Sequence, residues 1–353
     1  MALKPPVEVP QGAIRLNTDS QKLEFFAQDQ WWEMATDVPT LNGGVRGIFA
    51  GGWVNTPSTV YTNVIDYITI STAGNAVNFG DLLDKTSYLG SVASRTRGVY
   101  VGGSAEGTTQ NVMQYVTISS TGDAINFGDL TEQVKGMCGH SNETRGVVGS
   151  GFNPSPAFHG VNTLNYLTIA STGNADDFGD LPQTRVQAFS FGNSTRGIWG
   201  GGYYTGSNGT PGGTQTLVAL QLTTTGTAFE FGKLNSGEAQ EIRRAGLSNS
   251  IRGLAAGGNG QYYASRIDSF NIASLGSAEH FGELGYTIIE MMGSVSSPTR
   301  GVWAGGSMGP YSANNIIQYV TIATQGDAVD FGDLSDNTRS AYPRGISNAH
   351  GGL

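Results

Sequence analysis

The sequence has a single cysteine, Cys138, among its 353 residues. One thiol cannot form an intramolecular disulfide, so the fold must be held together by packing. Charged residues are also scarce, at 13% of the chain, and the formal net charge is −9. The chain lacks the clusters of Lys and Arg with which proteins bind nucleic acids and anionic membrane surfaces. We therefore expect no nucleic-acid partner.

Long apolar runs are missing as well. No stretch approaches the roughly 18 consecutive apolar residues that predict a transmembrane helix, and the first ten residues lack the apolar core of a signal peptide. We expect no membrane insertion. The abundant residue is glycine, with 53 copies. Together with many Ser, Thr and Asn residues, glycine is typical of short strands joined by tight turns.

A tetrapeptide of the form Phe-Gly-x-Leu, in which x is Asp, Glu or Lys, recurs six times. Its copies begin at Phe79, Phe127, Phe178, Phe231, Phe281 and Phe331. An Arg-Gly step recurs equally often, at Arg46, Arg97, Arg145, Arg196, Arg252 and Arg300. The spacings between these steps are 51, 48, 51, 56 and 48 residues. A period near 50 residues is typical of β-propeller blades and is too long for most helical repeats.

Each repeat predicts four strands. A short strand, such as residues 89–93, precedes an apolar strand that begins at Arg-Gly and ends in paired glycines, as in residues 97–103. A third strand alternates apolar and polar residues, as in residues 68–70, which indicates one buried face. A turn containing Gly with Asn or Asp leads to a fourth strand that ends at the Phe. We interpret the paired glycines as a sign of strands crowded around a narrow axis.

The two ends of the repeat region complement each other. The first repeat begins at Arg46 without a preceding strand, whereas residues 340–348, beyond the sixth Phe, match such a strand. We therefore expect the C-terminal strand to complete the first blade and to close the ring. The predicted fold class is all-β: a six-bladed β-propeller over residues 45–353, preceded by a small β-meander over residues 1–44.

From residue 46 to residue 350 the pattern resembles kelch repeats. The shared features are an apolar strand closed by Gly-Gly, a strand bearing a Tyr, a Gly turn and an aromatic residue. The Tyr occurs in four repeats, at Tyr67, Tyr115, Tyr166 and Tyr319. The kelch aromatic is a Trp much nearer the Tyr, whereas here Phe follows Tyr by 12 residues. The resemblance implies a kelch-like propeller with four-stranded blades.

The first 44 residues carry no copy of the repeat. They predict three short strands at residues 12–17, 23–26 and 31–34, with a turn at residues 18–21. Such a segment is too small to bury its four large aromatic residues alone. We expect these residues, Phe25, Phe26, Trp31 and Trp32, to attach the chain to a partner.

This segment resembles a β-meander of structural and tail-fibre proteins of tailed bacteriophages. The shared order is Gly-x-Ile-Arg-x-Asn-Thr, then Leu-Glu-x-aromatic, then aromatic-Trp. The repeats Thr-Arg-Gly-Val and Phe-Gly-Asp-Leu also look like those of phage virion proteins. The resemblance implies attachment of residues 1–44 to other virion proteins or to sister chains in a homo-oligomer. The alternative is that the segment packs on its own propeller as a plug.

The sequence offers no constellation for catalysis. It lacks the repeated Ser-x-Asp-x-Gly-x-Thr-Trp turn of sialidase-type propellers, and it lacks the paired histidines of a kelch-class copper oxidase. The four histidines lie apart along the chain, whereas a zinc site needs three or four convergent ligands. His140 replaces residues that are apolar in other repeats, so we expect it in the core. We expect no enzyme, no metal and no cofactor.

One Arg and usually one acid recur in every repeat. The acids are Asp81, Asp129, Asp180, Glu283 and Asp333, and Lys233 interrupts the series. A residue present in every blade is expected to be architectural, through pairing between blades or fixing of turns, because a functional site normally breaks the symmetry.

The repeats vary in length mainly after the paired glycines. These loops carry aromatic residues among Ser, Asn, Gly and Thr. The candidate ligand-binding residues are Trp53, Tyr61, Phe158, Tyr203, Tyr204, Tyr262, Tyr263 and Tyr311. Strand alternation places the loops on one face of the ring. Exposed aromatics in such surroundings suit sugar stacking or adaptable protein recognition, although Tyr can equally cap the blade ends.

These expectations combine into a non-enzymatic virion structural protein of a tailed phage, either a tail fibre, a tail tip or a surface decoration. Its propeller faces a glycan or protein of the host surface. The alternative is a bacterial glycan-binding or adhesin propeller with no role in a virion.

Overall fold

The computed structural model describes residues 9–17, 22–33, 45–55, 58–154, 159–205, 211–234, 242–258, 265–288, 292–308, 314–335 and 342–353. These residues form strands and turns but no helix, and hence no helix among them is long and apolar enough to cross a membrane. The all-β prediction is confirmed. The chain divides into two compact units, unit 1 (residues 1–42) and unit 2 (residues 43–353).

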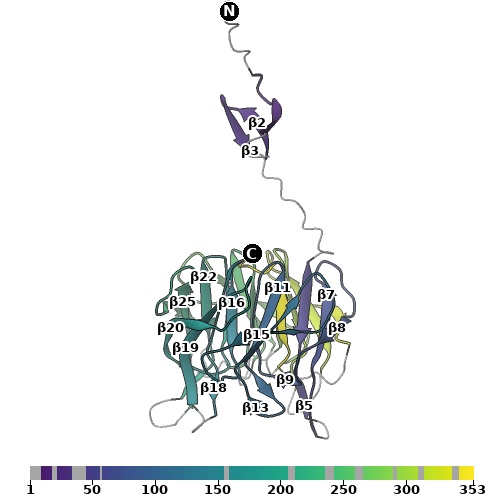
Figure 1. The fold of residues 1–353 in the computed structure, drawn as a ribbon, viewed down its shortest axis with the longest axis vertical. Coiled ribbons are helices and arrows are strands. Elements are labelled where there is room, and N and C mark those ends of the chain that lie inside the picture. Colours follow the sequence, from purple (N-terminus) through teal and green to yellow (C-terminus); the bar gives the residue numbers. More distant parts are fainter. Residues whose placement is uncertain are drawn as a thin grey trace, which may run out of the picture. The chain divides into compact units, whose positions relative to one another are not determined.

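Unit 1 contains a three-stranded antiparallel sheet of β1 (Ile14–Asn17), β2 (Lys22–Ala27) and β3 (Gln30–Glu33), with β2 in the centre (Figure 1). Gln28 and Asp29 form the turn between β2 and β3, with φ of 52° and 58°. Two such residues are typical of a tight hairpin turn. The three expected strands are present, whereas the expected turn at residues 18–21 and residue 34 lie outside the described residues.

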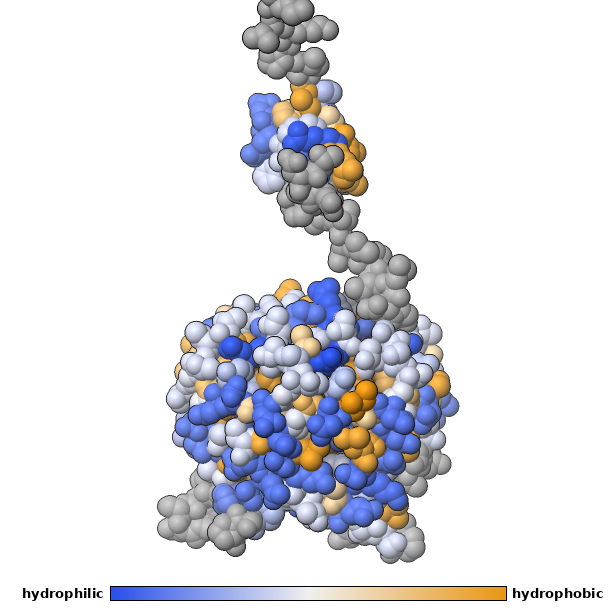
Figure 2. Space-filling view, in the orientation of Figure 1, coloured by the Kyte–Doolittle hydropathy of each residue, from blue (hydrophilic) through white to orange (hydrophobic). Residues whose placement is uncertain are grey.

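The register of this sheet puts five apolar side chains on one face. Ile14 lies opposite Phe25, Phe25 lies opposite Trp32, and Leu16 lies opposite Leu23. Their exposed fractions are 64% for Ile14, 60% for Leu16, 41% for Leu23, 37% for Phe25 and 43% for Trp32. Figure 2 shows hydrophobic residues gathered along one side of unit 1. We call these five residues the apolar face.

Unit 2 contains, among its described residues, six antiparallel sheets with a common four-strand order. Sheet 1 consists of β35 (Arg344–Ser347), β4 (Arg46–Ala50), β7 (Val64–Thr69) and β8 (Val77–Asp81). Sheet 2 consists of β10 (Gly90–Ala93), β11 (Arg97–Val101), β14 (Val112–Thr117) and β15 (Ile125–Asp129). Sheet 3 consists of β16 (Cys138–Ser141), β17 (Arg145–Gly149), β19 (His159–Thr168) and β20 (Asp176–Arg185).

The remaining three sheets repeat this order. Sheet 4 consists of β21 (Phe189–Gly192), β22 (Arg196–Gly200), β25 (Thr216–Gln221) and β26 (Phe229–Lys233). Sheet 5 consists of β27 (Ala245–Ser248), β28 (Arg252–Ala256), β29 (Arg266–Asn271) and β30 (Glu279–Glu283). Sheet 6 consists of β31 (Gly293–Ser296), β32 (Arg300–Ala304), β33 (Ile316–Thr321) and β34 (Val329–Asp333). In each of the six sheets the second strand begins at an Arg and is followed by Gly-Gly or Ser-Gly. We call the end of the sheet where this strand begins the arginine end, and the opposite end the glycine end.

The last strand of the chain completes the first sheet. β35 pairs antiparallel with β4, with Arg344 opposite Ala50 and Ser347 opposite Gly47. The backbone N–H of Arg46 also donates to Oδ1 of Asn348, 2.9 Å away. The pairing expected for the C-terminal strand is present, and it joins residues from opposite ends of unit 2.

The six sheets follow one another in a closed circuit of contacts. The first strands touch in the order β10, β16, β21, β27, β31 and β35, and β35 touches β10 again. Backbone hydrogen bonds between neighbouring sheets follow the same circuit. The N–H of Gly122 in sheet 2 donates to the Phe79 carbonyl of sheet 1, and the N–H of Gly74 in sheet 1 donates to the Phe331 carbonyl of sheet 6.

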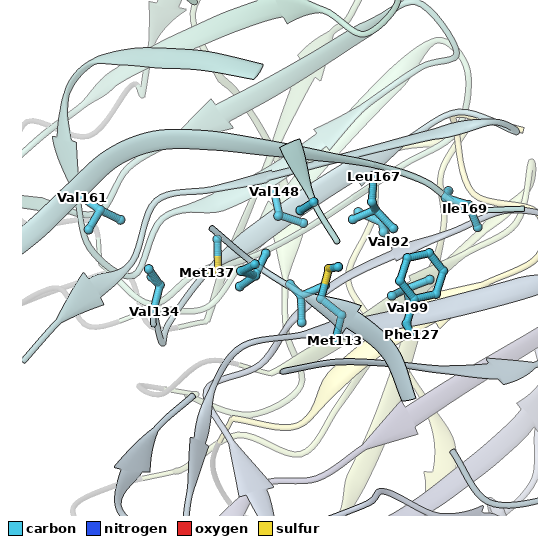
Figure 3. Close-up of a cluster of buried hydrophobic side chains, with 13 residues drawn as sticks. Val92, Val99, Met113, Phe127, Val134, Met137, Val148, Val161, Leu167 and Ile169 are labelled. Carbon is cyan, nitrogen blue, oxygen red and sulfur yellow. The ribbon is translucent and has the colours of Figure 1, made fainter. Parts of the chain in front are cut away.

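The hydrophobic core lies between successive sheets. Figure 3 shows one cluster, in which Val99, Met113 and Phe127 of sheet 2 meet Val148 and Leu167 of sheet 3. All six Phe residues of the Phe-Gly-x-Leu motif are buried, with exposed fractions of 2 to 3%. Their burial explains why the motif recurs once in every sheet.

The recurrent arginines join neighbouring sheets. Nη1 of Arg97 in sheet 2 donates to the Ile169 carbonyl of sheet 3 at 2.9 Å, and the guanidinium lies 4.3 Å from the ring centroid of Tyr115 in its own sheet. The equivalent donors and acceptors are Arg46 to Ile118, Arg145 to Leu222, Arg196 to Ile272, Arg252 to Ile322 and Arg300 to Ile70. The predicted architectural role of these arginines is confirmed.

The recurrent acidic positions share a role of their backbone. The Asp81 carbonyl accepts a hydrogen bond from Ala124, and the Lys233 carbonyl accepts the equivalent bond from Ala278. This backbone role explains why Lys can interrupt the acidic series. A glycine is required before each of these positions because the backbone of the neighbouring sheet comes close to it. A Cβ on Gly80, whose φ is +156°, would lie closer than 3.0 Å to the carbonyl oxygen of Gly122.

The paired glycines do mark close backbone approach, but the approach is to a neighbouring loop and not around a central axis. They lie at the glycine end, and both adopt positive φ, +58° at Gly102 and +96° at Gly103. A Cβ on Gly103 would lie 2.7 Å from the carbonyl oxygen of Ser87. The pair is therefore required by a left-handed turn and by the neighbouring loop. The first strands of neighbouring sheets approach each other closely at other glycines, such as Gly139, where a Cβ would lie 2.9 Å from the Ser91 carbonyl oxygen.

Candidate functional site

Three of the candidate loop residues, Trp53, Tyr61 and Tyr203, lie in the described part of the glycine end of unit 2. Trp53 and Tyr61 face each other in a hairpin of β5 (Trp53–Asn55) and β6 (Thr59–Tyr61), and both are half-buried. Tyr203 begins β23 (Tyr203–Thr205), which pairs with β24 (Pro211–Gly213). The side chain of Tyr204 and residues Phe158, Tyr262, Tyr263 and Tyr311 lie outside the described part.

Further short strands complete this end of the molecule. β9 (Thr86–Ser87), β12 (Ser104–Ala105) and β13 (Thr108–Thr109) form a small sheet, and β18 (Phe152–Asn153) pairs with β19. β9 belongs to the loop before sheet 2, whereas β12 and β13 belong to the loop inside it. The loop that connects sheets 1 and 2 is thus held to the loop inside sheet 2 by backbone pairing.

An aromatic cluster crosses this end from sheet 1 to sheet 3. Trp53 stacks on Tyr342, with ring centroids 6.4 Å apart and planes 12° apart. Tyr342 in turn stacks on Tyr88 at 3.8 Å, and Tyr88 meets the edge of Phe152 at 6.5 Å. We call Trp53, Tyr88, Phe152 and Tyr342 the aromatic cluster. It links loops that are far apart in the sequence.

Cations and amides surround the aromatic cluster. Nζ of Lys135 lies 4.9 Å from the ring centroid of Phe152, and partial burial lowers the pKa of this amine from its usual value. Nε2 of Gln187 donates to the Tyr342 hydroxyl at 3.2 Å, and Nε of Arg243 donates to Oε1 of Gln187 at 2.9 Å. Burial raises the pKa of Tyr203, and the nearby Arg243 opposes this shift. Phe152 and Tyr342 are buried, whereas Trp53 and Tyr88 are half-buried. The half-buried rings beside positive charge are therefore the ones that suit stacking on a polar ligand.

Sequence reasoning found Trp53 but missed Tyr88, Tyr342 and Lys135. Tyr88 and Tyr342 both lie two residues before a first strand and both adopt positive φ, 58° and 62°. Other repeats have Gly136, Gln187 or Arg243 there, so the position has no constant residue type. An alignment of the residues immediately before the first strands could have identified the shared position, but not the stacking.

The first strands of all six sheets enclose an opening at the middle of the circuit. Its serines bond across neighbouring strands: Ser91 donates to Gly345, Ser190 to Gly139 and Ser294 to Gly246, at 2.7 to 2.9 Å. Serine and glycine alternate around the circuit at this level. These hydroxyl groups therefore join the first strands to one another.

Two histidines that are 210 positions apart in the sequence lie together at the arginine end of this opening. The rings of His140 and His350 have centroids 5.5 Å apart. His140 is 7% exposed, which confirms its predicted burial. The expectation that the histidines are scattered is wrong for this pair, because the end of the chain folds back over the opening.

The last residues of the chain form a C-terminal latch, which we define as residues 348–353. Nε2 of His350 lies 3.0 Å from the Ala93 carbonyl and 3.3 Å from Oγ of Ser141. The N–H of Gly351 donates to the Ser248 carbonyl at 2.9 Å. Burial lowers the pKa of His140 to about 3 and that of His350 to about 4. The latch is thus bonded to sheets 2, 3 and 5 with both imidazoles neutral at pH 7.

The four aromatic residues predicted to attach unit 1 divide between its two faces. Phe25 and Trp32 belong to the apolar face, whereas Phe26 and Trp31 contact each other on the opposite face at 5.3 Å. The Arg15 guanidinium covers Trp31 at 4.1 Å. Sequence reasoning missed Ile14, Leu16 and Leu23, although the alternation of apolar and polar residues in β1 and β2 could have revealed them.

The described residues contain no group of three or more His, Cys, Asp or Glu that could hold a metal ion. The cysteine, Cys138, is buried, and burial raises the pKa of its thiol to about 11. No protein-family model matches this chain, and no curated protein matches its sequence.

Proposed function

We propose that unit 2 is a six-bladed, kelch-like β-propeller and that the chain is a non-enzymatic structural protein of a tailed-phage virion. In this proposal each sheet is one blade. The closed circuit of first-strand contacts, with β35 completing sheet 1, supports the blade arrangement. A ring of this kind leaves no open sheet edge along the circuit and presents loops at both ends.

The virion role rests above all on unit 1. It is a compact unit separate from unit 2, it carries the phage-like meander pattern, and five apolar side chains of one sheet face are exposed. An exposed apolar face on so small a sheet favours an assembly segment, because contiguous apolar surface is usually covered by a partner. Residues 1–44 attach the chain to other virion proteins or to sister chains.

The glycine end of unit 2 is the proposed host-facing surface. Its half-buried rings, with Lys135 and Arg243 nearby, suit a polar ligand such as a glycan. These rings are Trp53, Tyr61, Tyr88 and Tyr203. A stacked ring contributes about 0.5 to 1.5 kcal/mol beyond area burial, so a single copy binds weakly and adhesion needs several copies.

The decisive experiment is mass spectrometry of purified particles, followed by a reconstruction at side-chain resolution. We expect this chain in the particles with six blades per unit 2. A chain truncated to residues 45–353 should keep the melting temperature of unit 2 and be absent from particles. A protein that is absent from purified particles but binds glycans would support the bacterial adhesin instead.

Host recognition is tested with a double variant, Tyr61→Ser and Tyr203→Ser, at the glycine end. The matched control is Ile251→Ser, at a residue that is 68% exposed at the arginine end. We expect host adsorption of intact particles to fall severalfold in the double variant and to stay unchanged in the control. Unchanged adsorption in both would leave a structural or decorating role as the function.

A further inference from the structure

Two cations at the glycine end of the opening lack a carboxylate partner. Nζ of Lys135 lies 4.9 Å from the ring centroid of Phe152, and within the described part of the chain this ammonium makes no hydrogen bond or salt bridge. Arg344, the first residue of β35, lines the opening. Its guanidinium donates to the carbonyls of Leu89 and Met137 but pairs with no acid among the described residues. Both cations are half-buried, and charges taken out of water are costly unless an opposite charge compensates them.

Both cations break the repetition of the six sheets. The pairing registers put small or apolar residues at the position of Arg344 in the other sheets, namely Gly90, Cys138, Phe189, Ala245 and Gly293. The residues three positions before the other first strands, which correspond to Lys135, are Ser87, Val186, Ile242, Glu290 and Ala341. The packing that the six sheets share therefore requires neither positive charge.

The residue two positions before a first strand adopts positive φ in all five sheets where the structure describes it. The values are 58° at Tyr88, 73° at Gly136, 57° at Gln187, 65° at Arg243 and 62° at Tyr342. Glycine adopts this conformation without strain, yet four of the five positions carry a large side chain. Backbone strain of this kind is concentrated at sites that hold a ligand. We call these five residues the mouth residues.

Ring stacking and hydrogen bonds join the mouth residues to one another and to Lys135. Tyr88 stacks on Tyr342 with ring centroids 3.8 Å apart, and the Tyr342 hydroxyl accepts a hydrogen bond from Nε2 of Gln187 at 3.2 Å. Nε of Arg243 donates to Oε1 of Gln187 at 2.9 Å. Nζ of Lys135 lies 5.8 Å from the ring centroid of Tyr88. The ammonium is therefore part of a connected surface of rings and N–H donors.

The charge and the rings of this surface select an anionic sugar. Lys135 offers N–H donors and a positive charge, and a carboxylate complements both. The half-buried rings of Trp53 and Tyr88 both stack on Tyr342, and such rings suit a sugar better than an inorganic ion. The net charge of −9 opposes an anion at long range. At physiological ionic strength charges are screened over about 8 Å, so the nearby cations outweigh the net charge.

We propose that Lys135 and the mouth residues bind a carboxylate-bearing glycan. The carboxylate pairs with the Lys135 ammonium, and Arg344 adds positive potential from inside the opening. The sugar rings pack on the half-buried side chains of Trp53 and Tyr88. This inference rests on the proposed host-facing role of the glycine end and names the class of its ligand.

The first test compares acidic oligosaccharides with their own neutral methyl esters. The full chain is titrated calorimetrically at physiological ionic strength with oligosaccharides that contain galacturonate, glucuronate or N-acetylneuraminate. We expect at least one acidic form to bind about tenfold more tightly than its ester, because esterification removes the charge and keeps the sugar rings. Inorganic phosphate is the competing probe, and we expect it not to displace this glycan at equal concentration.

The second test removes the cation. Lys135→Gln and the control Lys85→Gln change the net charge equally, and Lys85 is an exposed residue of the loop before sheet 2. We expect the affinity of Lys135→Gln for the acidic glycan to fall about tenfold and that of Lys85→Gln to equal the parent's. Lys135→Arg keeps the charge and should restore most of the affinity. Equal melting temperatures of the variants show that the fold is intact.

Three results would overturn the proposal. They are acids and esters that bind equally or not at all, equal affinities of Lys135→Gln and Lys85→Gln, and displacement of the glycan by an equal concentration of phosphate. Failure of the proposed function looks different. Adsorption that depends on Tyr61 and Tyr203 without any binding of acidic glycans refutes only the ligand class. A chain that binds an acidic glycan through Lys135 but is absent from particles refutes only the virion role.

Discussion

Gly128 and Gly173 touch each other across sheets 2 and 3, yet their surroundings differ. A Cβ on Gly128, whose φ is +148°, would lie closer than 3.0 Å to the Gly173 carbonyl oxygen, whereas a Cβ on Gly173 would meet nothing within 4 Å. We expect Gly128→Ala to destabilise the protein by at least about 2 kcal/mol, and Gly173→Ala to change stability by less than about 0.5 kcal/mol. Urea unfolding of both variants tests this, and equal midpoints would contradict it.

The buried Phe residues of the Phe-Gly-x-Leu motif give a second prediction about single residues. Phe127 is 2% exposed, and Ile125, two residues earlier on the same strand, is 57% exposed. Phe127→Ala should reduce the free energy of unfolding by about 3 to 5 kcal/mol, because it leaves a cavity between two sheets. Ile125→Ala, the matched control, should cost less than about 0.5 kcal/mol. Similar losses in the two variants would refute the assignment of Phe127 to the core.

Single residues show where sequence reasoning succeeds. The recurrence of Phe and Arg predicts burial and architecture because every sheet poses the same packing problem. Tyr88 and Tyr342 could not be predicted, since their stacking depends on which loops the circuit brings together. Lys233 appeared to break a pattern of charge, but the pattern belongs to backbone carbonyls, which any residue supplies.

At the scale of elements, the C-terminal latch makes stability depend on pH. In the unfolded chain His140 and His350 titrate near pH 6.5, whereas burial lowers their folded pKa values to about 3 and about 4. The stability that comes from two neutral imidazoles is therefore fully present above about pH 6.5, and it is lost as the pH falls toward 4.

We test this with a double variant, His140→Val and His350→Gln. Val occupies the position of His140 in sheets 2 and 6, at Val92 and Val295, and Gln keeps a donor for the Ala93 carbonyl. The melting temperature of the parent should fall between about pH 7 and pH 5, and that of the double variant should fall less, because it lacks the two buried imidazoles. Parallel declines would show that the latch is insensitive to protonation.

Strands were the elements that sequence predicted best. Alternation in the third strand of each repeat and the turn residues after it are local signals, and the corresponding strands are present in all six sheets. The latch carried no such signal, because His-Gly-Gly forms no periodic pattern. Its position follows from contacts of His350 and Gly351 with strands 257 and 103 residues earlier, and local sequence does not encode such distances.

At the scale of the whole molecule, closure depends on residues 340–353. Their deletion should leave β4 without its partner β35 and remove the latch from the opening. We expect this truncated protein to aggregate through the exposed edge, whereas deletion of residues 1–44 should leave unit 2 soluble with an unchanged melting temperature. Size-exclusion chromatography and thermal melts distinguish these outcomes. A monomeric product lacking residues 340–353 that melts like the parent would contradict the role of β35.

The number of sheets and the source of the closing strand were predictable from the sequence, because counting repeats reveals an incomplete first copy and a surplus at the end. The division of unit 1 into two faces could not be predicted from the sequence. The aromatic residues Phe25, Phe26, Trp31 and Trp32 look alike in composition, and only the pairing register assigns them to different faces.

The pairing of β35 with β4 also dictates the order in which a newly made chain can fold. Arg46 and Asn348 are 302 residues apart, so at 5 to 20 residues per second β4 leaves the ribosome about 15 to 60 s before its partner. During that interval sheets 2 to 6 can form while sheet 1 waits with an open edge. A neighbouring nascent chain that finishes first can donate its own β35 to that edge, so exchange of the last strand between polysome-bound chains is the misassembly to expect.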